Sequence, residues 1–120
     1  METVPETAAE PAFREITVGS GDAARQIAVL ERAGKGRGIL FLGGYMSNMR
    51  GAKGDALDAY AAATGRPMTR FDYSGHGESG GRFEDGTISR WLEEASAVLD
   101  RAAGAPLILV GSSMGGWIAL

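Results

Sequence analysis

The sequence predicts an α/β fold in which an antiparallel N-terminal hairpin leads into a mostly parallel sheet flanked by helices. Two segments near the N-terminus alternate apolar and polar side chains, and short apolar runs follow them. These runs alternate with segments of helical period, which implies parallel strands joined by right-handed crossovers. A chain of 120 residues with a hydrophobic fraction of 44% suits one domain of this class.

The hairpin is predicted over residues 13–18 and 24–32, with Ile27 and Val29 on one side of its second strand. Two alternating segments separated by a short Gly-rich turn are typical of an antiparallel pair. Later apolar runs are uninterrupted, as expected for strands that are covered on both faces. These further strands are predicted at residues 39–42, 67–71 and 107–110.

Helices are predicted over residues 53–64 and 88–103, and a third begins after the tight turn at residues 111–116. Gly65 is expected to cap the end of the first helix, and Thr87 the start of the second, which Gly104 and Pro106 end. The predicted buried faces consist of Ala56, Leu57, Tyr60 and Ala63 in the first helix and of Ile88, Trp91, Leu92, Ala95, Val98, Leu99 and Ala102 in the second.

A G-x-S-x-G motif lies between the last predicted strand and the last helix. The segment Gly111-Ser112-Ser113-Met114-Gly115 fits it in one register only, with Ser113 at the centre. A nucleophile in this motif lies on a strained strand-to-helix turn, which presents its hydroxyl at the end of the sheet. Gly111 and Gly115 avoid side chains that would collide with backbone in so tight a turn. An ordinary Gly-rich turn, or one that cradles phosphate, is the alternative.

A serine nucleophile needs hydrogen-bond donors for the oxyanion that develops during attack. The backbone N–H of Met114 lies at the start of a helix, where the helix dipole also favours negative charge. The loop after residues 39–42 supplies the second candidate donor, the N–H of Tyr45. The alternative is that its glycine pair, Gly43-Gly44, only closes the strand.

Three segments, in this order, resemble the α/β-hydrolase superfamily. They are Leu42-Gly43-Gly44-Tyr45, Phe71-Asp72-Tyr73-Ser74-Gly75-His76-Gly77-Glu78-Ser79 and Gly111-Ser112-Ser113-Met114-Gly115-Gly116-Trp117. The resemblance extends from about residue 13 to the end of the chain. It is strongest to serine esterases and thioesterases near the palmitoyl-protein thioesterase branch, because the Gly-Tyr-Met-Ser loop is followed by Arg50-Gly51-Ala52-Lys53.

The resemblance implies a partial α/β-hydrolase fold, with strand order 1-2-4-3-5 and residues 107–110 at the sheet edge. It makes Ser113 the nucleophile and the Tyr45 and Met114 N–H groups the oxyanion hole, with no metal or organic cofactor. In the family the triad Asp and His follow the nucleophile, so both are expected beyond Leu120, and the fold is expected to be truncated after the nucleophile elbow.

The expected function is hydrolysis of carboxylic ester or thioester bonds through an acyl-enzyme on Ser113, weak or absent in this chain alone. The alternative is a non-catalytic remnant or binding module that lacks the Asp and His of the triad. A nucleotide-binding protein is the third hypothesis, since residues 75–80 match G-x-G-x-x-G. No helix is predicted directly after that match, so a pyrophosphate would lack its helix N-terminus.

Other residues with chemistry have simpler interpretations. His76 is the only histidine, and its loop lies at the same edge of the sheet as Ser113, so it is a candidate general base. A Gly-flanked His in a turn more often packs a loop. Asp72 is expected to make local turn hydrogen bonds. The remaining assignments place Glu93 and Glu94 on the solvent side of the second helix, and Trp91 and Trp117 in the core.

Composition excludes several classes of function. The net charge is −3 without a cluster of Lys and Arg, which argues against nucleic-acid partners. The chain has no Cys and one His, so thiolate and His-rich metal sites are excluded. No apolar run approaches the ~20 residues of a membrane span. The expected partner is a small-molecule or acylated substrate, and the oligomeric state stays open.

The domain assignment divides the chain into a disordered leader, residues 1–12, and the N-terminal portion of a hydrolase domain, residues 13–120. The leader lacks the basic and apolar regions of a signal peptide. A cytoplasmic location is therefore expected.

Overall fold

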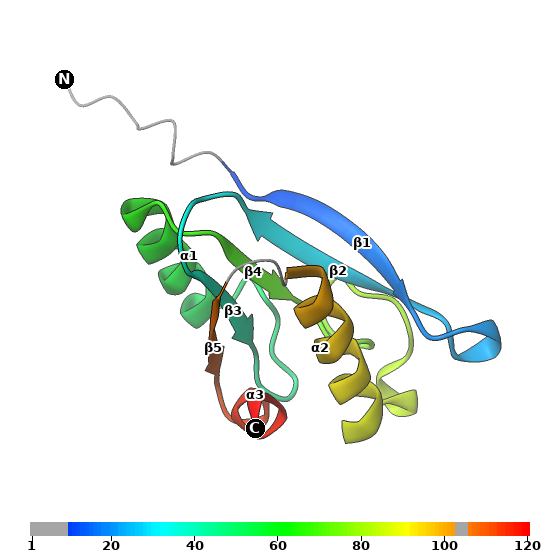
Figure 1. Cartoon of the computed structure of the whole chain (residues 1–120). Coiled ribbons are helices and arrows are strands. Elements are labelled where there is room, and N and C mark those ends of the chain that lie inside the picture. The colour runs from blue at the N-terminus through cyan, green and yellow to red at the C-terminus, as the bar shows by residue number, and fades with distance from the viewer. Residues whose placement is uncertain (1–9, 103–105) are drawn as a thin grey trace.

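The computed structural model describes residues 10–102 and 106–120, and its five-stranded sheet has the order β1-β2-β4-β3-β5 (Figure 1). Strand β1 (Ala12–Val18) pairs antiparallel with β2 (Arg25–Arg32), and β2 pairs antiparallel with β4 (Met68–Phe71). Strand β3 (Gly38–Leu42) is parallel to both β4 and β5 (Leu107–Gly111). The predicted hairpin and strand order are confirmed, and β5 forms one edge of the described sheet.

The described residues also form three α-helices and two short 3-10 turns: α1 (Ala52–Thr64), α2 (Ile88–Ala102), α3 (Met114–Ala119), η2 (Gly21–Ala23) and η3 (Phe83–Asp85). Both predicted caps are confirmed. Gly65 has φ 71° after α1, and the Thr87 hydroxyl accepts the Arg90 N–H at 3.1 Å at the start of α2. The predicted end of α2 at Ala103 and Gly104 lies outside the described residues. None of the helices in the described part of the chain is long and apolar enough to cross a bilayer.

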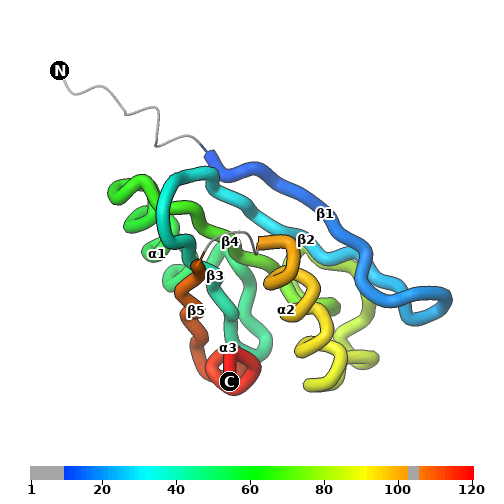
Figure 2. The backbone as a smooth tube through the Cα atoms, viewed as in Figure 1, coloured from blue at the N-terminus to red at the C-terminus, as the bar shows by residue number. Residues whose placement is uncertain are grey.

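The sheet separates two hydrophobic layers, with α1 on one face and α2 and α3 on the other (Figure 2). Trp91, Ala95 and Val98 of α2 pack on one face together with Ile118 of α3. On the opposite face, Ala61 of α1 packs against strand residues. Covering both faces explains why β3 is apolar throughout, because each side chain of that strand meets one layer or the other.

Six residues expected on buried helix faces or in the core are exposed. In α1 the buried residues are Gly54, Asp58 and Ala61, whereas Tyr60 of the predicted apolar face is 52% exposed. The other corrections concern Ala56 and Ala63 of α1, Ile88 and Leu92 of α2, and Trp117 of α3, all of which are exposed. The reason lies in the packing: α1 approaches the sheet through small residues, and the apolar groups of α2 and α3 beside β5 have no described segment over them.

Glu94 also contradicts its prediction, because it is fully buried rather than on the solvent side of α2. Its carboxylate accepts a hydrogen bond from Arg25 Nε at 2.7 Å and another from the Ser74 N–H at 2.7 Å. Arg25 is itself buried on β2 and also pairs with Glu93 at 2.7 Å. A buried carboxylate is tolerated when a cation and hydrogen bonds satisfy its oxygens.

A second ion cluster joins α1 to the sheet. Asp58 accepts two 2.7 Å hydrogen bonds from Arg32, and Arg70 Nη2 lies 3.4 Å from the same carboxylate. Asp55 pairs with Arg70 at 2.8 Å, but its side chain is 63% exposed. The hydrogen bonds from Arg32 lower the pKa of Asp58, and the charge of Arg70 acts in the same direction.

We expect Asp58→Asn to lower the free energy of unfolding by about 3 kcal/mol at neutral pH, because it removes a buried carboxylate that two guanidinium groups share. Since the folded-state pKa of Asp58 is lowered, this stabilisation is present above the ordinary carboxyl pKa and is lost as pH falls through the lowered one. Urea unfolding at neutral and acidic pH measures both effects.

Asp55→Asn is the matched control, since it removes a carboxylate from the same Arg70 at an exposed position. Its expected cost is below about 1 kcal/mol. Equal losses for the two variants at neutral pH would contradict the prediction.

Candidate active site

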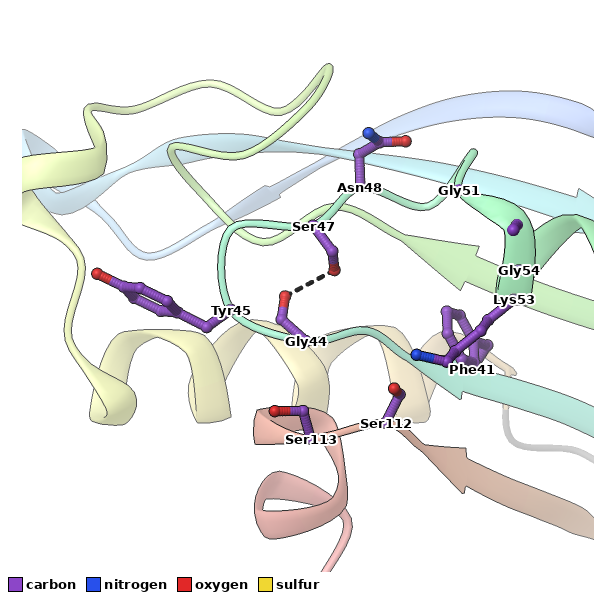
Figure 3. Close-up of a pocket in the computed structure, with 11 residues that line it drawn as sticks. Phe41, Gly44, Tyr45, Ser47, Asn48, Gly51, Lys53, Gly54, Ser112 and Ser113 are labelled. Atoms are coloured by element: carbon purple, nitrogen blue, oxygen red, sulfur yellow. Dashed lines mark hydrogen bonds between the residues drawn. The ribbon is translucent and has the colours of Figure 1, made fainter.

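Three loops meet at one edge of the sheet, around Ser113 (Figure 3). Parallel strands point their carboxyl ends the same way, so the loops after β3, β4 and β5 leave together. The loop after β3 carries Tyr45, the loop after β4 carries Asp72 and His76, and the turn after β5 carries Ser113. The candidate residues therefore come from segments that are distant in sequence and adjacent in space.

Ser113 lies in the tight turn between β5 and α3, with φ 57° and ψ −118°. A residue with a side chain rarely adopts this backbone conformation, which costs on the order of 1–3 kcal/mol. Hydrogen bonds support the turn: the Gly115 N–H donates to Ser112 O at 2.9 Å, and the Ser112 N–H donates to Leu42 O at 3.0 Å. Ser113 is exposed, and its hydroxyl has no hydrogen-bond partner among the described residues.

Gly111 and Gly115 lie where the turn leaves no room for side chains. A Cβ on Gly111 would lie 2.5 Å from the carbonyl oxygen of Gly115, and a Cβ on Gly115 would overlap the carbonyl oxygen of Leu42. Real Cβ atoms do not approach backbone so closely, so the elbow requires glycine at both positions. Gly116 differs, since its nearest contact would be Gly111 O at 3.9 Å.

The backbone amides of Tyr45 and Met114 belong to the two segments that adjoin the Ser113 side chain. A Cβ placed on Gly44, the residue before Tyr45, would lie 3.3 Å from Ser113 Cβ and 3.9 Å from its Oγ. Met114 follows Ser113 directly as the first residue of α3. Neither amide has a hydrogen-bond partner among the described residues, so both N–H groups can bind an oxyanion.

The loop after β4 holds the loop after β3 in place. Asp72 Oδ1 accepts the Met49 N–H at 2.7 Å, and its Oδ2 accepts the Glu78 N–H at 2.9 Å. Burial raises the pKa of Asp72, and these two N–H groups oppose the rise. The predicted turn hydrogen bonding of Asp72 is confirmed, and the bond to Met49 extends it across to another loop.

His76 is buried, and both of its ring nitrogens are engaged. Nε2 accepts the Met46 N–H at 3.0 Å, and Nδ1 lies 3.0 Å from Ser74 O. Because a carbonyl oxygen only accepts, Nδ1 carries the proton and Nε2 is the acceptor. Neither nitrogen is left to deprotonate Ser113, so the expectation that His76 packs a loop is the one the geometry favours.

The G-x-G-x-x-G segment at residues 75–80 closes on itself, with the Gly75 N–H donating to Gly80 O at 2.9 Å. Only the 3-10 turn η3 intervenes before α2 begins at Ile88, so no α-helix N-terminus follows the glycines. The described residues also contain no group of three or more His, Asp and Glu that could hold a metal ion.

Ser113 opens into a cavity of about 390 Å³ between the loop after β3, the start of α1 and the elbow (Figure 3). Its walls combine the Phe41 ring with hydroxyl groups of Ser47, Ser112 and Ser113, and Lys53 is its one charged lining residue. Sequence reasoning missed Ser47 and Lys53 as site residues. The only signal for them was their position in the segment after Tyr45.

We expect Gly115→Ala to lower the free energy of unfolding by about 3 kcal/mol, because its methyl group would overlap the end of β3. Gly116→Ala is the matched control one residue later in α3, where space exists and alanine favours a helix by up to about 1 kcal/mol. Urea unfolding of both variants tests the difference. A Gly115→Ala protein as stable as Gly116→Ala would show that the elbow can relax.

The sequence is similar to a known protein family and to several curated proteins. Residues 39–120 match the family described as Serine aminopeptidase, S33. The chain is 45% identical over 85 residues to the mitochondrial palmitoyl-protein thioesterase ABHD10 of Bos taurus, covering 71% of this chain and 28% of that protein. It is 42% identical over 94 residues to the Homo sapiens ABHD10, covering 78% and 31%.

Two solved structures share the fold. A protein from Agrobacterium vitis superposes with a TM-score of 0.89 at 55% identity, covering 92% of this chain and 44% of that one. The mouse alpha/beta hydrolase domain-containing protein 10 superposes with a TM-score of 0.80 at 37% identity, covering 88% and 42%. This chain spans less than a third of the length of the curated relatives. It belongs to the α/β-hydrolase superfamily, in the family described as Serine aminopeptidase, S33.

Proposed function

We propose that these residues supply the nucleophile and oxyanion hole of a serine hydrolase that cleaves carboxylic esters or thioesters. One observation carries the proposal: the exposed hydroxyl of Ser113, on a strained elbow, lies beside two backbone amides that have no partner among the described residues. A hydroxyl next to unused N–H donors is the arrangement that acyl transfer requires.

In the proposed reaction, Ser113 Oγ attacks the acyl carbonyl while its proton passes to a general base. The carbonyl oxygen becomes an oxyanion and accepts hydrogen bonds from the Tyr45 and Met114 N–H groups. Collapse of this intermediate breaks the bond to the alcohol or thiol, which leaves with the proton. Water then hydrolyses the acyl-enzyme by the same steps and frees Ser113.

The base and the acid that orients it are proposed to lie in sequence beyond Leu120. His76 does not fit the role, because both of its ring nitrogens already form hydrogen bonds or close polar contacts. The family resemblance places the acid and base after the nucleophile, and the relatives are longer than this chain. The 120 residues alone are accordingly expected to hydrolyse esters slowly or not at all.

The names of the curated relatives support acylated substrates. Each relative quoted above is named as a palmitoyl-protein thioesterase. We therefore propose a thioester or ester of a carboxylic acid as the substrate class, with no assignment of the acyl chain length.

A non-catalytic module is the second candidate. The observation that favours it is the lack of a free imidazole near Ser113 among the described residues. Such a module would keep the fold of the elbow without an activated hydroxyl.

A fluorophosphonate probe separates these candidates, because it reacts only with an activated serine. We expect the full-length protein to be labelled on the peptide that contains Ser113, and Ser113→Ala to lose the label completely. Ser112→Ala should keep it, since Ser112 lines the same cavity but does not share the positive φ of Ser113. Intact-mass and peptide mass spectrometry measure the label; an unlabelled full-length protein would favour the non-catalytic module.

A further inference from the structure

The loop after β3 carries two neighbouring backbone amides close to the cavity. Its residues 43–51, called here the oxyanion loop, contain the Tyr45 and Met46 N–H groups in succession. Met46 has φ 60°, the left-handed region in which residues other than glycine are uncommon. Within the loop, the Ser47 N–H and hydroxyl both donate to Gly44 O, at 3.3 and 2.7 Å, and a further contact from outside the loop adds stabilisation.

His76 provides that stabilisation. Its Nε2 accepts the Met46 N–H at 3.0 Å, across 30 residues of sequence. A hydrogen bond to a buried acceptor contributes about 1 kcal/mol net, which is comparable to the cost of the left-handed backbone. The Met46 amide is thereby used, and the Tyr45 amide is the one left without a partner beside Ser113.

The imidazole is itself held in one orientation. Its Nδ1 contact with Ser74 O at 3.0 Å places the proton on Nδ1, so the Nε2 lone pair faces Met46. Aromatic rings surround it, with the centroids of Phe83 and Trp91 each 5.4 Å from the imidazole centroid. Ser74 is anchored in turn, because its N–H donates to the buried Glu94.

A second contact fixes the other end of the oxyanion loop. Asp72 Oδ1 accepts the Met49 N–H at 2.7 Å, and this carboxylate belongs to the same segment after β4 as His76. Met49 itself is buried under β2. With Met49 held by Asp72 and Met46 by His76, the turn that carries the Tyr45 amide is tied to the segment after β4 at two points.

We propose that His76 is a positioning residue for catalysis: by accepting the Met46 N–H, it directs the adjacent Tyr45 N–H at the oxyanion. This inference rests on the proposed function of Ser113 and assigns His76 a role that acts through Tyr45, without contact to the substrate. It differs from loop packing alone, because an apolar side chain of similar size would fill the same space and leave Met46 N–H without its acceptor.

The test compares steady-state kinetics of two variants in the full-length protein. His76→Leu keeps apolar bulk and removes the acceptor, so we expect kcat to fall about 10- to 100-fold with KM nearly unchanged, because a misplaced donor affects the transition state. His76→Gln offers a side-chain carbonyl as acceptor and should recover most of the lost kcat. If the role of His76 were only structural, both variants would have a lower melting temperature, and kcat would not differ between them in this way.

Ser79→Ala is the matched control. The Ser79 hydroxyl ties the same segment to the sheet, since it accepts the Ala28 N–H at 2.8 Å and donates to Asp72 O at 2.5 Å. It does not contact Met46, so the variant should lose stability and keep the wild-type kcat. A fall in kcat for Ser79→Ala as large as that for His76→Leu would overturn the proposal.

The structural part is measured directly by NMR on the wild-type full-length protein, which does not depend on the folding of a variant. A nitrogen–nitrogen coupling across the hydrogen bond from Met46 to His76 Nε2 is expected, together with a protonated Nδ1. Absence of the coupling would overturn the proposal. If the full-length protein is not labelled at Ser113, both the proposed function and this inference are wrong. If Ser113 is labelled and His76→Leu keeps the wild-type kcat, only this inference is wrong.

Discussion

The close contact between the first turn of α3 and the end of β3 is the constraint on which the candidate site depends. Gly115 lies against the carbonyl oxygen of Leu42, and the Ser112 N–H donates to that same oxygen at 3.0 Å. Backbone can approach backbone this closely only without a side chain between them. The contact brings the loop that begins at Gly43 against Ser113, and so places two backbone amides around one hydroxyl.

This contact does not reach Met46 and Met49 of the oxyanion loop, which bind the segment after β4 instead. His76 and Asp72 accept N–H groups from Met46 and Met49, which are successive anchor points on the loop. The segment is held in turn by Glu94 of α2, whose carboxylate is shared between Arg25 and the Ser74 N–H. Buried charges therefore connect the N-terminal hairpin to the candidate site through a chain of hydrogen bonds. Their desolvation cost is offset only because every partner is present.

The elements that could be predicted are those whose cause is local in the chain. The apolar run of β3, the Thr87 and Gly65 caps, and the Gly spacing around Ser113 each depend on residues a few positions apart. The wrong expectations concern residues whose environment depends on distant parts of the chain. The burial of Glu94 escapes prediction because its cation, Arg25, lies 69 residues earlier in the chain. The exposure of Trp117 escapes prediction because helical period does not say which faces of a helix other segments cover.

The sequence by itself determined the fold class, the strand order by resemblance, the elbow at Ser113 and the two amides that could serve it. Glycine spacing and hydrophobic period encode these features within short windows, so no distant partner is needed to read them. Three features were decided only by the tertiary structure: which amide of the oxyanion loop has no partner, which group His76 Nε2 binds, and which charges are buried. Those outcomes depend on contacts between residues 20 to 69 positions apart, which form only once the sheet brings its loops and helices together.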